Sequence, residues 1–213
     1  MDLRKRLSKN FTLGEFLRSA TAERHEDIVK EQYNPPEEVV ANLAYLCSTT
    51  LQPIRDLFGI PLRITSGYRC KKLNDLVGSS DRSQHLKGQA ADCQLPSRFL
   101  NHQDTQRIRQ KIEDRVRTVT GEPLRPDTNA NFYLFAYICL RLDHLDIDQV
   151  IHEYGAGFGR PAWIHIAASP SDRDKRQMLC LGSYLPQKRD EPENIITALN
   201  YGTSQQPDLS NIA

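Results

Sequence analysis

The chain has 213 residues, a mass of 24.4 kDa and a formal charge of +1, from 28 basic and 27 acidic side chains. This balance argues against a general nucleic-acid binder or a protein of anionic membranes, because both need an excess of basic residues. Apolar residues make up 38% of the chain and charged residues 26%, as in soluble globular proteins. No apolar run is long enough to cross a membrane. We therefore expect neither nucleic acid nor a membrane as a partner.

The five cysteines are widely spaced, and no Cys-x-x-Cys pair occurs among them. This pattern predicts neither a disulfide framework nor a cysteine zinc site, and it favours reduced thiols. The first ten residues are basic, but no apolar segment follows them, so no secretory signal peptide is predicted. We expect a monomer that is cytoplasmic as synthesised.

Two helices are predicted in the first third of the chain. In the first, at residues 12–21, Thr12 can cap the helix and Glu15 can reach back to it. The second spans residues 34–58 and begins with a cap residue and two prolines, followed by apolar residues at helical spacing. Pro53 should bend or divide this helix.

The remaining predicted elements are two strands, then two helices, then three strands. Residues 155–159, which are rich in glycine, predict a hairpin-like connection. Together the elements predict an α+β fold with a small, mainly antiparallel sheet and helices packed on one face. We expect one domain over residues 1–186 and a polar, partly disordered tail over 187–213. Strands are predicted at 62–66, 90–94, 149–154, 163–167 and 179–184, helices at 104–118 and 132–142, and a loop at 121–131.

The densest chemical signal is Ser83-Gln84-His85-Leu86-Lys87-Gly88-Gln89-Ala90-Ala91-Asp92. His85 and Asp92 are seven residues apart, and Gly88 between them permits a tight turn. The two side chains can therefore converge on one point. Imidazole and carboxylate are zinc ligands, but two ligands do not make a site.

His165 is the best source of a third ligand. On a strand, Trp163 and His165 face one way, while Ile164 and Ile166 face the other. The isoleucines suit the core, which leaves His165 facing a cleft, although an ordinary core histidine is the alternative. Two histidines, one aspartate and an open fourth position would form a catalytic zinc site rather than a structural one.

The signature Ser83-x-His85-x-x-Gly88-x-Ala90-x-Asp92 resembles that of zinc D-Ala-D-Ala carboxypeptidases and peptidoglycan endopeptidases. These enzymes share a fold with the zinc domain of hedgehog proteins. Residues 97–142 have no counterpart in this resemblance and are expected to be an insertion. Further segments resemble the phage-type branch of the family, at residues 11–22, 51–55, 66–69, 148–153 and 163–165.

The resemblance implies one zinc ion per chain, held by His85, Asp92 and His165. It also implies hydrolysis of a peptide bond in bacterial peptidoglycan by a zinc-activated water. The bond remains open among a D-Ala-D-Ala terminus, a D,D-crosslink and an L-Ala-D-Glu bond. Because this substrate lies outside the cell, we expect a phage or prophage lysis protein, similar to an endolysin, that a separate membrane pore releases.

A carboxylate must accept the proton of the attacking water and pass it to the leaving amine. Glu153 matches the acid of the phage-type pattern and is the expected base. His152 takes its place if the strand register is shifted by one residue. Some relatives carry an acid or a second histidine just before the last histidine, where this chain has Pro161, Ala162 and Trp163.

Three residues are expected to bind substrate. Arg69 would clamp a peptide carboxylate, because guanidinium binds carboxylate in a bidentate manner. Ser83 would orient a ligand or the peptide. Tyr68 could donate a hydrogen bond to the developing oxyanion. Surface cover for Arg69 and packing for Tyr68 are the alternatives.

Two other functions stay open at this point. The chain could be a non-catalytic zinc module that binds a wall fragment or a partner, as hedgehog domains show this fold can be. It could also be a thiol peptidase that uses Cys70 with His85 and Asp92. Sensitivity to a chelator rather than to an alkylating reagent would separate the zinc enzyme from the thiol enzyme.

Overall fold

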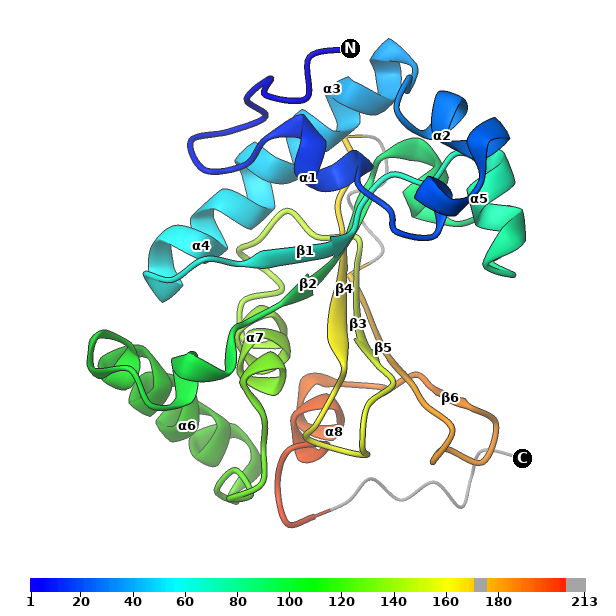
Figure 1. Ribbon diagram of the computed structural model, residues 1–213. Helices are drawn as coiled ribbons and strands as arrows, with labels where there is room; N and C mark the ends of the chain where they lie inside the picture. The colour runs from blue at the N-terminus through cyan, green and yellow to red at the C-terminus, as the bar shows by residue number, and fades with distance from the viewer. Residues whose placement is uncertain (171–175, 206–213) are drawn as a thin grey trace.

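The computed structural model describes residues 1–170 and 176–205, and a six-stranded sheet runs through it (Figure 1). The strands lie in the order β1-β2-β4-β3-β5-β6. The β3–β5 pair is parallel and the other pairs are antiparallel, which confirms the predicted α+β fold. The strands are β1 (Arg63–Ser66), β2 (Ala90–Gln94), β3 (Gln149–Glu153), β4 (Trp163–Ala167), β5 (Gln177–Leu181) and β6 (Arg189–Asp190).

The helices gather at the two ends of the sheet (Figure 1). Helices α1, α2, α3 and α5 lie at one end, and α6, α7 and α8 lie at the other, where α7 contacts β3 and β4. The bounds are α1 (Leu13–Leu17), α2 (Glu26–Gln32), α3 (Glu37–Leu46), α4 (Gln52–Phe58), α5 (Lys71–Leu76), α6 (Gln106–Thr120), α7 (Ala130–Cys139) and α8 (Ile195–Asn200).

The two faces of the sheet differ in character. Alternate residues of β2 and β4 are fully buried and belong to one continuous core with α3 and α7, among them Cys93, Ile164 and Ile166. The residues between them, Asp92 and His165, point to the opposite face. Helices α3 and α7 therefore pack with the buried face, and Asp92 and His165 are left on the other face.

The predicted helix over residues 34–58 is two helices. Helix α3 begins at Glu37, after Pro36 as its N-cap, and α4 begins at Gln52. Between them, residues 47–51 form a π-helical turn. Pro53 in the first turn of α4 has no N–H to donate and its ring crowds the preceding turn, which accounts for the division.

Several element ends differ from the predictions. Helix α1 ends at Leu17 rather than at residue 21, because Arg18 has extended backbone angles. Helices α2 and α5 were not predicted, since both are short and rich in charged residues. The predicted loop over 121–131 gives way to α7 at Ala130.

The segment from residue 187, predicted as a polar and partly disordered tail, contains regular structure in its described part. Strand β6 pairs with β5, and α8 packs on α6 and α7. Tyr201 is fully buried, and its hydroxyl donates a hydrogen bond to Asp190 Oδ2. Residues 206–213 lie outside the described residues, and the division of the chain into domains stays a prediction.

His152 lies on the core face of β3. Its ring is fully buried near the rings of Phe132, Phe135 and Tyr201, at centroid distances of 6.0, 5.6 and 5.8 Å. Burial lowers the pKa of His152 to about 3, so the folded protein keeps the ring neutral. His152 therefore faces away from Asp92 and His165.

This burial predicts a loss of stability in acid. Below the ordinary histidine pKa of about 6.5 the unfolded chain binds a proton at His152 that the folded chain does not. The free energy of unfolding should therefore fall as the pH drops from about 6.5 towards 3, by about 1.4 kcal/mol per pH unit from this group. Urea unfolding of the chelator-treated protein at several pH values should show a shallower acid slope for His152→Phe. An unchanged slope would contradict this assignment.

Candidate metal centre

A short 3₁₀ helix (Gln84–Lys87) carries His85, which is 2% exposed. Gly88 follows it with φ +67°, in the left-handed region, and a Cβ there would lie 2.6 Å from the Val39 carbonyl oxygen. Only glycine fits this turn, which sends the chain directly into β2. The turn that Gly88 predicted from the sequence is therefore present.

Asp92 and His165 are cross-strand partners in the β2–β4 ladder. Side chains at such paired positions lie on the same face, a few ångströms apart. Asp92 is 4% exposed and His165 is 6% exposed. The antiparallel register therefore places Asp92 and His165 side by side. The Gly88 turn brings His85 to the same point.

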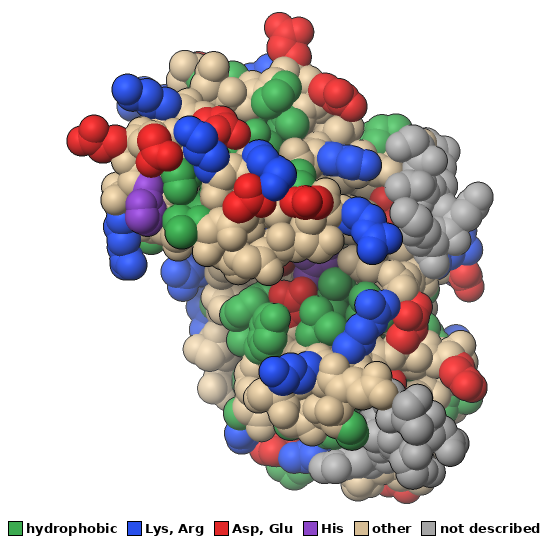
Figure 2. All heavy atoms as spheres, turned by 90° about the vertical axis from the view of Figure 1, so that its right-hand side faces the viewer, with side chains coloured by type: hydrophobic (Ala, Val, Ile, Leu, Met, Phe, Trp, Pro, Cys, Tyr) green, Lys and Arg blue, Asp and Glu red, His purple; other side chains and the backbone are tan. Residues whose placement is uncertain are grey.

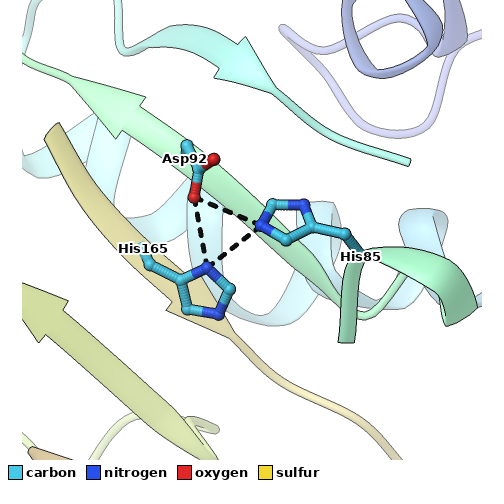
Figure 3. Close-up of side chains that lie close together, drawn as sticks. All are labelled: His85, Asp92 and His165. Atoms are coloured by element: carbon cyan, nitrogen blue, oxygen red, sulfur yellow. Dashed lines mark hydrogen bonds and ion pairs between the residues drawn. The ribbon is translucent and has the colours of Figure 1, made fainter. Parts of the chain in front are cut away.

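Three atoms of these side chains converge (Figure 3). His85 Nε2 lies 3.1 Å from His165 Nδ1 and 3.2 Å from Asp92 Oδ1. His165 Nδ1 lies 3.1 Å from the same Asp92 oxygen. Neighbouring ligand atoms around a tetrahedral zinc ion, with bonds of 2.0–2.1 Å, are about 3.3 Å apart. The three atoms therefore fit a metal ion in both chemistry and spacing.

The second nitrogen of His85 supports this donor set. His85 Nδ1 lies 2.6 Å from the carbonyl oxygen of Gly67, to which it can only donate. That bond fixes the tautomer and leaves the Nε2 lone pair for a cation, as in most histidine ligands of metals. The ring is thus oriented before any metal arrives.

The three residues lie in a cleft of about 1950 Å³ between the N-terminal helices and the open face of the sheet. Figure 2 shows it as a hollow with histidine and acidic side chains on its floor. Glu153, Arg69, Tyr68 and Ser83, each given a role from the sequence, line the same cleft. The structure therefore brings all of the predicted site residues to one place.

A model of the peptidase M15 family matches residues 9–121, about half of the chain. The chain belongs to the peptidase M15 family. This is the metallopeptidase family of D-Ala-D-Ala carboxypeptidases and hedgehog-like zinc peptidases, so the resemblance seen in the sequence is confirmed. No curated protein matches the chain.

In this M15 peptidase, the family match includes some residues of the site, and the pairing of the strands places the others. The matched segment contains His85 and Asp92 but ends before Glu153 and His165. The latter two are placed by the β2–β4–β3 ladder, which joins the matched segment to the rest of the sheet. The family implies a peptide substrate, and the described helices include none that is long and apolar enough to span a membrane.

In this M15 peptidase, Arg69 contacts the candidate metal site through Asp92. Its Nη2 donates to Asp92 Oδ2 at 2.9 Å, and its Nε donates to Ser66 Oγ at 3.1 Å. Burial raises the pKa of Asp92, but His85 and His165 lower it more, so the net pKa is far below the usual range and Asp92 stays ionised. Nη1 of Arg69 has no hydrogen-bond partner among the described residues.

This contact predicts a loss of zinc affinity when Arg69 is replaced. Arg69→Met would leave Asp92 Oδ2 without its donor, and such losses weaken metal binding about 10- to 100-fold. A competition titration against a chromophoric chelator measures the effect. Arg98→Met, at an exposed position outside the cleft, is the control. Unchanged affinity in Arg69→Met would contradict the positioning role and leave only the predicted substrate clamp.

Glu153 faces the cleft, and its neighbour His152 faces the core, so the register is the one that the sequence favoured. Burial raises the pKa of Glu153, and the charge of Asp92 raises it further. A carboxylate with a raised pKa is a better proton acceptor at neutral pH. The raised pKa of Glu153 and its position in the same cleft as the triad both suit a general base.

Cys70 does not have the surroundings of a nucleophile. It is fully buried in the core, outside the residues that line the cleft. Burial also raises its pKa, whereas a reactive cysteine needs a lowered pKa and solvent access. The thiol-peptidase alternative therefore finds no support in the geometry.

Sequence reasoning gave no role to Ser66, Gly67 or Trp163. Ser66 and Gly67 orient Arg69 and His85, and both precede Arg69 in the Ser-Gly-Tyr-Arg segment of the resemblance. Trp163 donates a hydrogen bond from its indole Nε1 to Glu153 Oε2. Trp163 lies two residues before His165 on one strand, and this spacing could have indicated from the sequence that Trp163 faces the site.

Proposed function

We propose that the chain hydrolyses a peptide bond in the stem peptides of bacterial peptidoglycan, with one zinc ion held by His85, Asp92 and His165. The observation that carries the proposal is the buried triad on the floor of a cleft that Glu153 also lines. Membership of the M15 metallopeptidase family supports the same reaction. The carboxyl group of Glu153 in the cleft favours an enzyme over a non-catalytic zinc module that only binds a wall fragment or a partner.

A zinc ion at this position would activate a water molecule and polarise the scissile carbonyl. Glu153 would accept the proton of that water and transfer it to the leaving amine. The hydrogen bond from Trp163 occupies Oε2 of Glu153, and Oε1 has no partner among the described residues. Oε1 is therefore the oxygen assigned to the proton transfer.

Three further residues of the cleft would hold the peptide. Nη1 of Arg69 is available for a substrate carboxylate. Burial raises the pKa of Tyr68 to about 12, so its hydroxyl stays protonated and can donate a hydrogen bond to a developing oxyanion. Ser83, which is half-buried at the start of the 3₁₀ helix, can contact the peptide beside His85.

A role in phage or prophage lysis fits this chemistry. The proposed substrate lies outside the cell membrane. Release through a separate membrane pore would give the chain access to the wall. Fractionation before and after lysis tests this role, and retention inside healthy cells followed by release at lysis is the expected result. Secretion from growing cells would contradict it.

Digestion of purified muropeptides, followed by mass spectrometry, tests the proposed reaction. Substrates with a D-Ala-D-Ala terminus, a D,D-crosslink or an L-Ala-D-Glu bond should include at least one that gains the mass of one water on cleavage. A chelator should abolish the cleavage, and an alkylating reagent should leave it unchanged. Binding without cleavage would instead identify a wall-binding zinc module.

A further inference from the structure

Trp163, the only tryptophan of the chain, lies directly opposite Glu153 in the β3–β4 ladder. Its indole N–H donates to one oxygen of the Glu153 carboxylate and leaves the other without a partner among the described residues. The bond restricts how the carboxylate can rotate. A proton acceptor must lie within hydrogen-bond reach of the proton that it takes, so this restriction bears on the reaction.

Tyr154, which also lines the cleft, packs against the indole ring. The two ring centroids are 5.4 Å apart at an interplanar angle of 50°. Tyr154 is 49% exposed and has φ +51°, a left-handed conformation that is unfavourable for residues other than glycine. Such strain persists where the surrounding structure imposes it, and it gathers at functional sites.

The turn between β3 and β4 imposes this conformation. Gly155 has φ +89°, and a Cβ there would collide with the Arg160 carbonyl oxygen. At the other end of the turn, side-chain amides at the start of α7 donate hydrogen bonds to backbone carbonyls. Asn129 Nδ2 donates to the Pro161 carbonyl at 2.8 Å, and Asn131 Nδ2 donates to the Ala162 carbonyl at 2.9 Å. The residues just before Trp163 are therefore fixed by the segment that the sequence marked as an insertion.

We propose that Trp163 is a positioning residue for Glu153, and that Tyr154 and the amides of Asn129 and Asn131 hold Trp163 in place. This inference rests on the proposed role of Glu153 as general base. It also gives Asn129 and Asn131 a purpose, because their amides fix the backbone from which the indole projects. Trp163 acts through Glu153 and needs no contact with the substrate.

The kinetic test uses Trp163→Phe, which keeps an aromatic ring and removes the N–H donor. We expect kcat to fall about 10-fold or more, a part of the 10²- to 10⁴-fold that a positioned base contributes. KM and the zinc content should stay close to those of the wild type, because substrate and metal contacts are unchanged. In a Glu153→Gln background the same substitution should cause no further loss, since the two residues act as one unit.

A second variant tests the brace. Tyr154→Ala should lower kcat in the same way as Trp163→Phe, by a smaller factor, with KM unchanged. Ile196→Ala removes a side chain of similar exposure, 46% against 49%, from α8 outside the cleft and is the matched control. An equal effect of both variants on kcat would show a general loss of stability and would overturn the bracing role.

A spectroscopic measurement tests the contact without any activity. A single tryptophan gives one indole N–H signal in a ¹H–¹⁵N correlation spectrum. We expect this signal to exchange slowly with solvent in the wild type, and to shift and exchange faster in Glu153→Ala. An indole signal that does not respond to Glu153→Ala would overturn the inference.

The outcomes separate this inference from the proposed function. An active wild type with an inactive Glu153→Gln variant and a fully active Trp163→Phe variant would overturn the positioning role alone. Equal losses from Trp163→Phe in the wild-type and Glu153→Gln backgrounds would do the same. A wild type without hydrolytic activity, or a fully active Glu153→Gln variant, would overturn the proposed mechanism and this inference with it.

Discussion

Glu153→Gln should retain about one zinc ion per chain while kcat falls by about 10²- to 10⁴-fold. The substitution keeps the size and the hydrogen-bonding oxygen of the side chain but removes its ability to accept a proton. Glu153 is not one of the three convergent ligands, so the metal site should remain intact. Elemental analysis and single-turnover hydrolysis of a muropeptide measure the two quantities on the same sample.

Glu23→Gln provides the matched control for Glu153→Gln. Glu23 lines the other wall of the cleft, where it accepts a hydrogen bond from the Tyr33 hydroxyl at 2.7 Å. Its substitution removes one negative charge from the cleft without touching the triad, and we expect a rate close to that of the wild type. Full turnover by Glu153→Gln would assign the proton transfer to another group.

His85→Ala, Asp92→Ala and His165→Ala should each lose zinc and, with it, hydrolytic activity. Each variant removes one of three buried donors, and the two that remain cannot hold the ion. The loss of affinity should exceed about 100-fold, the upper figure for changes that affect only the partners of a ligand. Direct titration of the metal-free variants with zinc measures the affinity.

Exposed histidines supply the control for the ligand variants. His25 and His144 lie outside the cleft, and their replacement by alanine should leave zinc binding unchanged. Circular dichroism of each metal-free variant separates a lost ligand from a lost fold. Wild-type zinc affinity in any of the three ligand variants would contradict the assignment of that ligand.

The convergence of His85, Asp92 and His165 was predictable from the sequence because local signals determine it. The His85–Asp92 spacing with Gly88 between them encodes one tight turn, and the structure contains that turn. Strict alternation around Ile164 and Ile166 encodes which face His165 takes, and both isoleucines are fully buried. Strands β1, β2, β3 and β4 were predicted within a residue or two of their bounds in the structure.

Long-range pairings were not predictable from one sequence. Nothing near Arg69 indicates that its partner is Asp92, 23 residues later, because the β1–β2 register creates that contact. The Trp163–Glu153 bond likewise depends on the β3–β4 register. Strand β6 and α8 were missed because β6 has only two residues, both charged, and α8 has only six. Their place is set by β5 and by the burial of Tyr201.

The most direct test of zinc-dependent hydrolysis measures muropeptide cleavage by the metal-free chain before and after addition of one equivalent of zinc. We predict no cleavage by the metal-free chain, recovery with zinc in the wild type, and no recovery in His85→Ala. Cleavage that persists in the metal-free wild type, or that never appears with zinc bound, would contradict a zinc-dependent peptidase.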